Sequence, residues 1–203
     1  MPETTTLETV LLDAQRRGWI GAGPLPRAIA HASGFAEGPV PAPSSFADLG
    51  SGGGLPGLVL AVAWPEARAV LIEGSATRAG FLVDAVESLG LIDRCTVIAV
   101  RAEEAGRRPE LRSSFDVVVA RGFGAPAVTA ECAAPLLRVG GHVLVSEPPD
   151  DTARWPEDGL APLGLSPTER WSTDFHYQSL LQVSLCPARY PRRVGIPTKR
   201  PLF

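Results

Sequence analysis

The chain has 203 residues, of which 45% are apolar, and a net charge of −3 at pH 7. This length predicts one ordinary α/β domain with a substantial core, and the slightly acidic balance excludes a general affinity for nucleic acid but not local basic patches. No long uncharged apolar run predicts a transmembrane helix, and the acidic N-terminal stretch is not typical of a signal peptide, so we expect a cytoplasmic protein with no membrane partner.

The cysteines and histidines predict no metal site. Cys95, Cys132 and Cys186 have no C-x-x-C spacing, which favours buried thiols in a reducing compartment. The three histidines are also too scattered for a metal-ligand set.

Apolar residues at helical spacing predict an amphipathic helix over residues 6–17, capped by Thr5 or Thr6. Residues 21–43 are rich in glycine and proline, so we expect a loose lead-in with one short helix at 26–32.

Strand and helix patterns then alternate. The expected strands cover residues 46–49, 69–73, 95–100, 115–120 and 142–147, and the expected helices cover 56–63, 77–89 and 125–137. Continuous apolar strands are typical of a parallel sheet with both faces covered. Residues 168–177 and 179–186 follow each other without a helix, which indicates a hairpin. The predicted fold is therefore α/β, with a doubly wound, mostly parallel seven-stranded class I methyltransferase (Rossmann-like) sheet and an antiparallel C-terminal hairpin strand.

Three segments follow from these patterns. We expect an N-terminal helical extension and linker over residues 1–44, a ligand-binding domain over 45–188 and a basic tail over 189–203. The tail is rich in proline and arginine, so we expect it to be extended.

Residues 46–57 have the strand, glycine-rich loop and helix pattern of a nucleotide-binding βα unit. Asp48 stands two residues before Gly50, which gives Asp-x-Gly-x-Gly. An acidic residue there repels a pyrophosphate and suits the ammonium of a methionine moiety, so the pattern favours S-adenosylmethionine. Two other interpretations stay open: the G-x-G-x-x-G pattern that begins at Gly52 is typical of a dinucleotide site, and a glycine-rich loop can simply form a tight turn.

The ends of the later strands carry further candidates. Glu73 ends the second expected strand, where an acidic side chain accepts hydrogen bonds from ribose hydroxyls. Arg101, Ala102 and Glu103 follow the third, beside the expected adenine. Arg121 ends the fourth, where it could hold a cofactor carboxylate, a carboxylate partner or an RNA phosphate, or form a structural ion pair.

With these motifs in place, the chain resembles the RsmG (GidB) family of bacterial small-subunit ribosomal RNA guanine-N7 methyltransferases. The motifs that carry the resemblance cover residues 48–57, 71–73 with Arg78, 101–104, 115–121, 135–141 and 190–202. The resemblance implies S-adenosyl-L-methionine as the cofactor and methylation of a guanine N7 in 16S ribosomal RNA. It implies cofactor contacts at Gly50, Leu55, Ala102, Glu103 and Arg121, with Asp48 and Glu73 supporting them. We also expect a catalytic role for Arg121 and further cofactor contacts at Ser51, Gly52, Gly54, Gly74 and Arg78.

The resemblance also implies ribosomal RNA or the small ribosomal subunit as the partner of a monomeric enzyme. The residues expected to contact RNA phosphates are Arg189, Arg192, Arg193, Lys199 and Arg200.

Two departures from the family keep other functions open. Glu147 stands where the family has a lysine, and the family's N-terminal His-Leu-Leu-Asp-Ser-Leu stretch is reduced to residues 31–33. A carboxylate repels RNA phosphates, so a divergent methyltransferase with another substrate is an alternative. A catalytically inactive cofactor-binding homologue and an NAD-dependent oxidoreductase are further alternatives.

Overall fold

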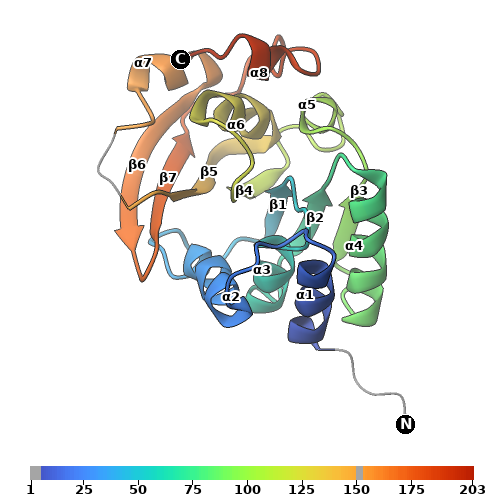
Figure 1. The fold of residues 1–203 in the computed structure, drawn as a ribbon. Helices are drawn as coiled ribbons and strands as arrows, with labels where there is room; N and C mark the ends of the chain where they lie inside the picture. Colours follow the sequence, from blue (N-terminus) through green and yellow to red (C-terminus); the bar gives the residue numbers. More distant parts are fainter. Residues whose placement is uncertain (1–5, 150–152) are drawn as a thin grey trace.

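The structure is a computed structural model that describes residues 6–149 and 153–203, and this part of the chain forms one seven-stranded sheet covered by helices on both faces (Figure 1). The strands are β1 (Ser45–Leu49), β2 (Arg68–Ile72), β3 (Cys95–Ile98), β4 (Phe115–Ala120), β5 (Leu137–Glu147), β6 (Leu165–Ser172) and β7 (His176–Gln182). The helices are α1 (Leu7–Arg16), α2 (Leu25–Ser33), α3 (Gly57–Ala63), α4 (Ala76–Ser88), α5 (Ala102–Ala105), α6 (Pro126–Ala133), α7 (Glu157–Leu160) and α8 (Ile196–Lys199), with short 3-10 turns η1 (Gly34–Ala36), η2 (Ala134–Leu136) and η3 (Ala161–Leu163).

The strand order is β3-β2-β1-β4-β5-β7-β6. Strands β1 to β5 are parallel, and β7 is antiparallel to both β5 and β6. This confirms the mostly parallel sheet and its antiparallel hairpin strand. Because parallel strands place their carboxyl ends at one edge, the loops after β1, β2, β3 and β4 meet there.

The two faces of the sheet bury different side chains of the same strands. Phe46 and Val117 pack into the core beneath α3 and α4, whereas their neighbours Ala47 and Val118 pack into the core beneath α6. This alternation is the two-residue period of a β-strand, and it explains why β1 and β4 carry apolar residues at successive positions. Full burial of a side chain such as Phe46 contributes roughly 2 kcal/mol.

The N-terminal segment is packed onto the domain, so the expectation of a loose lead-in over residues 21–43 is wrong. Helix α1 begins where the Thr6 hydroxyl accepts a hydrogen bond from the Thr9 N–H, as the sequence predicts for a threonine cap. At the end of α2, the Tyr177 hydroxyl donates to the His31 carbonyl at 2.8 Å, and just after the helix the Trp171 indole donates to the Gly34 carbonyl at 2.9 Å. These contacts join the segment to the β6–β7 hairpin.

The hairpin turns earlier than the sequence indicated. The predicted break lay at residue 178, but the turn covers residues 173–175, between β6 and β7. Thr173 and Asp174 are residues that favour turns, and the Thr173 N–H donates to the Phe175 carbonyl at 2.9 Å. The strand expected over residues 179–186 therefore starts three residues earlier, at His176, and ends at Gln182.

The C-terminal segment is folded rather than extended. Arg112 donates hydrogen bonds of 2.7–3.0 Å to the carbonyls of Cys186, Pro187 and Tyr190, which fixes the start of the segment. The segment then forms the single turn α8, at the end of the molecule where α6 and α7 lie (Figure 1). Its apolar residues contact the core, and Tyr190 is buried.

All three cysteines are free and buried, as the sequence predicts. In the part of the chain that the structure describes, no helix is long and apolar enough to span a membrane. The boundaries at residues 44 and 188 stay predictions.

Candidate active site

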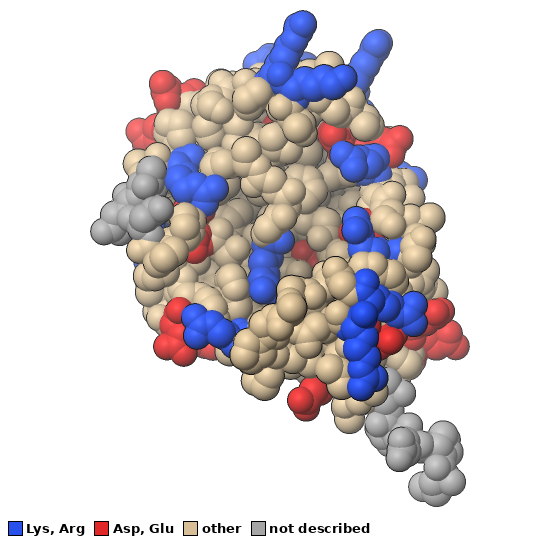
Figure 2. Space-filling view, viewed as in Figure 1, with Lys and Arg blue, Asp and Glu red and all other residues tan. Residues whose placement is uncertain are grey.

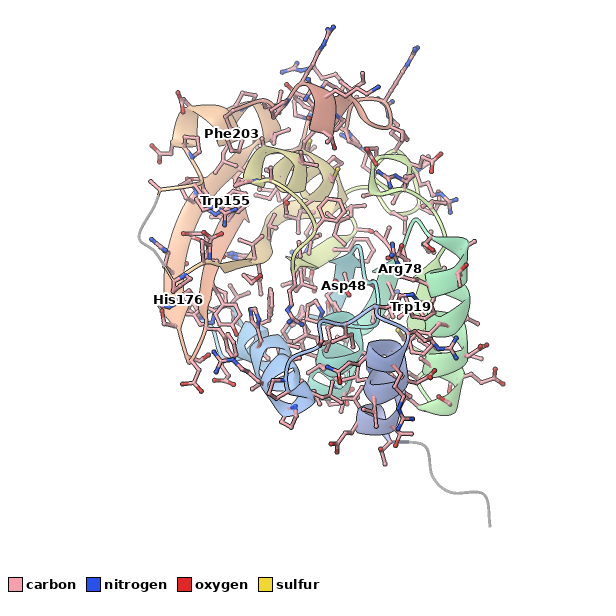
Figure 3. All side chains as sticks on the ribbon, in the orientation of Figure 1. Trp19, Asp48, Arg78, Trp155, His176 and Phe203 are labelled. Carbon is pink, nitrogen blue, oxygen red and sulfur yellow. The ribbon has the colours of Figure 1, made fainter. Side chains whose placement is uncertain are left out.

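A cleft of about 820 Å³ opens at the carboxyl ends of the parallel strands. Figure 2 shows a hollow in this face, with Lys and Arg side chains on several sides of it. Four loops supply its walls, and the N-terminal and C-terminal segments supply the rest. Trp19 and Arg78, both labelled in Figure 3, are among the lining residues. Its lining comprises Trp19, Ile20, Gly21, Gly50, Ser51, Gly52, Gly53, Leu55, Ile72, Glu73, Gly74, Ser75, Arg78, Val100, Arg101, Ala102, Glu103, Arg121, Gly122, Phe123, Gly124, Ala125, Val128, Cys132, Thr198 and Pro201.

The loop after β1 presents bare backbone to the cleft. Gly50 has φ +76° and Gly52 has φ +55°, a left-handed conformation that favours glycine. A Cβ on Gly50 would also lie 2.7 Å from a ring carbon of Phe123. Gly54, expected to contact the cofactor, is not among the lining residues, because it packs against Leu58 behind the loop.

Asp48 is buried beneath this loop and does not line the cleft. Its Oδ2 accepts a hydrogen bond from the Gly57 N–H at 3.0 Å, while its Oδ1 is buried without a hydrogen-bond partner. The side chain is almost fully buried, and burial raises the pKa of Asp48 to about 7 against the hydrogen bonds from Ser51 and Gly57. The sequence placed this carboxylate in direct contact with a ligand, whereas the structure places it beneath the glycine backbone.

The raised pKa of Asp48 predicts a pH dependence of stability. Because the folded state favours the protonated form, this contribution is fully present below about pH 4 and is lost as the pH rises through about 7. Asp48→Asn removes it. We expect urea unfolding to show that, between pH 5 and pH 8, the free energy of unfolding of the variant rises relative to that of the wild type by on the order of 2 kcal/mol. A constant difference between the two proteins at all pH values would contradict the assignment.

Glu73 stands immediately after β2 as a fixed acceptor. Its Oε2 accepts from the Gly52 N–H at 2.9 Å, and its Oε1 accepts from the Ser75 N–H at 2.7 Å and from Arg78 Nη2 at 2.8 Å. Burial acts to raise the pKa of Glu73, but these hydrogen bonds outweigh it and the pKa is lowered. The carboxylate therefore stays ionised and ties the glycine loop to the start of α4. Its contact with a ribose stays a prediction.

Arg121 follows β4 and lines the cleft. Burial lowers the pKa of Arg121, and the charges of Tyr177 and Asp48 oppose this effect only from a distance. Among the residues that the structure describes, none forms a hydrogen bond or an ion pair with its guanidinium. The structural ion pair that the sequence left open is thus not found there. A half-buried guanidinium without a partner indicates a site for an anionic group.

The adenine-side motif contributes backbone and a small side chain rather than a free carboxylate. Ala102 and Glu103 begin α5, on the wall of the cleft. Glu103 Oε1 accepts a hydrogen bond from the Gly195 N–H at 2.9 Å, and its Oε2 lies 3.8 Å from Arg101 Nε. The sequence did not anticipate this bond to the C-terminal segment.

Two charged residues that the sequence analysis related to RNA phosphates, Glu147 and Arg192, form contacts within the protein instead. The Glu147 side chain is only 3% exposed and accepts from the Trp155 indole at 3.0 Å, with Arg154 Nη1 3.4 Å away. It therefore does not present the free carboxylate that the sequence suggested. Arg192, expected on RNA phosphates, pairs instead with the buried Glu131 at 2.6 Å. The other four expected RNA contacts, Arg189, Arg193, Lys199 and Arg200, are exposed.

The cleft fits S-adenosylmethionine. A methionine moiety carries a carboxylate, and the cleft presents the guanidinium of Arg121, which has no hydrogen-bond or ion-pair partner among the described residues. Glu73 supplies an ionised acceptor at the end of β2, where ribose hydroxyls are bound in this type of sheet. Gly50 and Gly52 leave the main chain open to close approach.

Solved structures share this architecture. An O-methyltransferase from Bacillus cereus in complex with SAH has a TM-score of 0.63 at 18% identity, over 89% of this chain and 92% of that one. TYW2 from P. horikoshii in complex with MeSAdo has a TM-score of 0.59 at 15% identity, over 77% of this chain and 64% of that one. The fold is that of class I methyltransferases.

The chain belongs to the GidB family, described as rRNA small subunit methyltransferase G, whose sequence profile matches residues 35–151. The ribosomal RNA small subunit methyltransferase G of Rubrobacter xylanophilus is 40% identical over 180 residues, which cover 81% of this chain and 67% of that protein. The protein of the same name from Roseiflexus castenholzii is 38% identical over 169 residues, which cover 79% of this chain and 72% of that protein.

Proposed function

We propose that this enzyme transfers the methyl group of S-adenosylmethionine to N7 of a guanine in the 16S ribosomal RNA of the small subunit. Arg121 carries the proposal, because its guanidinium lines the cleft and forms no hydrogen bond or ion pair with any residue that the structure describes. Glu73 and the main chain of the glycine loop support it. The names of the relatives point to ribosomal RNA as the substrate.

The reaction needs alignment more than proton transfer. When bound, S-adenosylmethionine supplies an electrophilic methyl group on a sulfonium. Guanine N7 has a lone pair and no proton, so the chain needs no general base. Arg121 would orient the methionine end, Glu73 the ribose, and the walls of the cleft would exclude water around the reacting atoms.

The observation that favoured a different substrate was Glu147. Because this carboxylate is held by Trp155 and Arg154, it presents no free negative charge to an RNA phosphate. The case for another substrate is weaker for that reason. The proposed function implies a cytoplasmic enzyme, and we expect a monomer.

The phosphate contacts would come from the exposed basic residues of the C-terminal segment. Figure 2 shows Lys and Arg side chains projecting at the end of the molecule where α8 lies. We expect simultaneous replacement of Arg189, Arg193, Lys199 and Arg200 by glutamine to weaken RNA binding. The slope of log affinity against log salt should flatten by about 3, since each phosphate contact contributes roughly 0.7–0.9. Arg68→Gln, at the opposite end of β2, is the control, and an unchanged slope in the quadruple variant would exclude the segment as the RNA contact.

Nucleoside mass spectrometry tests the substrate directly. Purified protein, S-adenosylmethionine and small subunits from a strain that lacks the enzyme should yield one additional 7-methylguanosine per 16S RNA. A methyl group at another atom, or none while S-adenosylhomocysteine still binds, would contradict the proposed substrate and leave the cofactor site standing.

A further inference from the structure

The C-terminal segment forms part of the cofactor cleft. Thr198, in α8, and Pro201, just beyond it, line the cleft opposite the glycine loop. Both lie far in the chain from the motifs after β1 and β2, so the shape of this wall depends on how the segment is attached.

One attachment is an ion pair between a buried carboxylate and a partly exposed arginine. Glu131, in α6, is fully buried, and Arg192 donates to it from Nε at 2.9 Å, from Nη2 at 2.6 Å and from its own backbone N–H at 2.8 Å. The same Nη2 also donates to the Arg200 carbonyl at 2.7 Å. Arg192 therefore connects α6 to both sides of the α8 turn.

A buried carboxylate is a costly way to attach a segment. Removing the charge of Glu131 from water costs several kcal/mol, and apolar residues of similar size often stabilise a fold as well or better. A bidentate Arg–carboxylate pair adds geometric specificity, because the planar guanidinium and the planar carboxylate form their two hydrogen bonds in only one relative orientation. The pair thus fixes the position of the segment more than it adds to the stability of the fold.

A second attachment reaches the adenine side of the cleft. The Gly195 N–H donates to Glu103 Oε1 at 2.9 Å, and Gly195 has φ +79°, which favours glycine. Glu103 follows Ala102 on the wall formed by α5. The segment is therefore attached on two sides, at α5 and at α6, with the cleft-lining residues Thr198 and Pro201 held beyond both attachments.

We propose that Arg192, together with its buried partner Glu131, is a positioning residue that holds the C-terminal segment as a wall of the cofactor cleft and thereby sets the affinity for S-adenosylmethionine. This inference rests on the cofactor site and is independent of which RNA is methylated. It also explains why one arginine of a basic tail is directed inward while its neighbour Arg193 is exposed.

Two conservative variants test the proposal. Arg192→Lys keeps the positive charge beside Glu131 but loses the bidentate geometry, and Glu131→Gln keeps the shape but loses the charge. We expect each to raise the dissociation constant of S-adenosylhomocysteine and the KM for S-adenosylmethionine about tenfold. The kcat and the KM for RNA should stay within about twofold, and calorimetry should still show one site per chain.

The matched control is Arg138→Lys, which alters the Arg138–Asp116 ion pair near the amino ends of β4 and β5. It should leave the dissociation constant unchanged. A purely structural pair would instead lower the fraction of active protein and the melting temperature, with the dissociation constant of the remaining folded protein unaltered. That outcome in Arg192→Lys would overturn the proposal, and because the binding measurement needs no RNA, it is distinguishable from failure of the proposed substrate.

Discussion

Arg121→Ala should weaken the binding of S-adenosylhomocysteine about 30- to 100-fold and abolish detectable methyl transfer. A hydrogen bond to a charged group contributes about 1.5–3 kcal/mol, and each 1.4 kcal/mol is a factor of ten in affinity. The variant should remain as stable as the wild type, because no partner of Arg121 is found among the described residues and its removal leaves no buried carboxylate behind. Calorimetric titration and thermal unfolding measure the two effects on the same samples.

Two controls separate charge from geometry at this position. Arg121→Lys keeps the charge but cannot form a bidentate contact, so its affinity should lie between those of the alanine variant and the wild type. Arg68→Ala removes an exposed arginine at the opposite end of β2 and should bind as the wild type does. An alanine variant at position 121 that binds with unchanged affinity would show that the guanidinium does not contact the cofactor.

Gly57→Ala should destabilise the fold by about 3 kcal/mol and lower the melting temperature by roughly 10 °C. A Cβ at this position would lie 2.4 Å from Asp48 Oδ2 and 2.5 Å from a methyl carbon of Leu71, both inside the core. Asp48 or α3 must therefore move, and the hydrogen bond from the Gly57 N–H to Asp48 is strained or lost. Because the same bond supports the glycine loop, the affinity for S-adenosylhomocysteine should also fall.

Gly80→Ala is the matched control for this substitution. Gly80 lies inside α4, and a Cβ there would meet nothing within 4 Å. Alanine has a higher helix propensity than glycine, so the free energy of unfolding of this variant should rise by up to about 1 kcal/mol. If urea unfolding shows the two alanine variants to be equally stable, the close packing of Gly57 against Asp48 is not what positions the loop.

The parts of the fold that local pattern determines could be predicted. The strands over residues 46–49 and 115–120 were predicted to within one residue, because a short, mostly apolar run of this kind is typical of a buried strand in an alternating α/β chain. The position of Glu73 beside the glycine loop follows from the same topology, since both stand at the carboxyl ends of adjacent parallel strands.

The folded conformation of the C-terminal segment was not predicted, because the prediction considered its charged and proline residues and not its apolar ones. Tyr190 and Pro197 are buried, and Phe203 packs on the core, so this segment is folded. Arg192 differs from Arg193 because it pairs with Glu131, a residue far away in the chain. Nothing in the sequence near these two arginines indicates that difference. The apolar residues interleaved with the basic ones were the signal that could have indicated a packed tail.

Asp48 and Glu147, which the sequence analysis expected to present free carboxylates, are buried by contacts that the local sequence does not indicate. Asp48 is covered by its own loop, and Glu147 is held by Trp155, eight residues further along the chain. The N-terminal wall of the cleft, with Trp19 and Ile20, was missed for a similar reason. Its glycine-rich surroundings were interpreted as loose, whereas Ala14 and Ile20 pack against the loop at Gly53.

The most direct measurement compares S-adenosylhomocysteine with 5′-methylthioadenosine, which has the same nucleoside and sulfur but no amino acid end. In calorimetric titrations of the purified protein we expect the first compound to bind at one site, at least 30-fold more tightly than the second, because only it carries a carboxylate for Arg121. Equal affinities, or no heat with either compound, would contradict the account of this cleft.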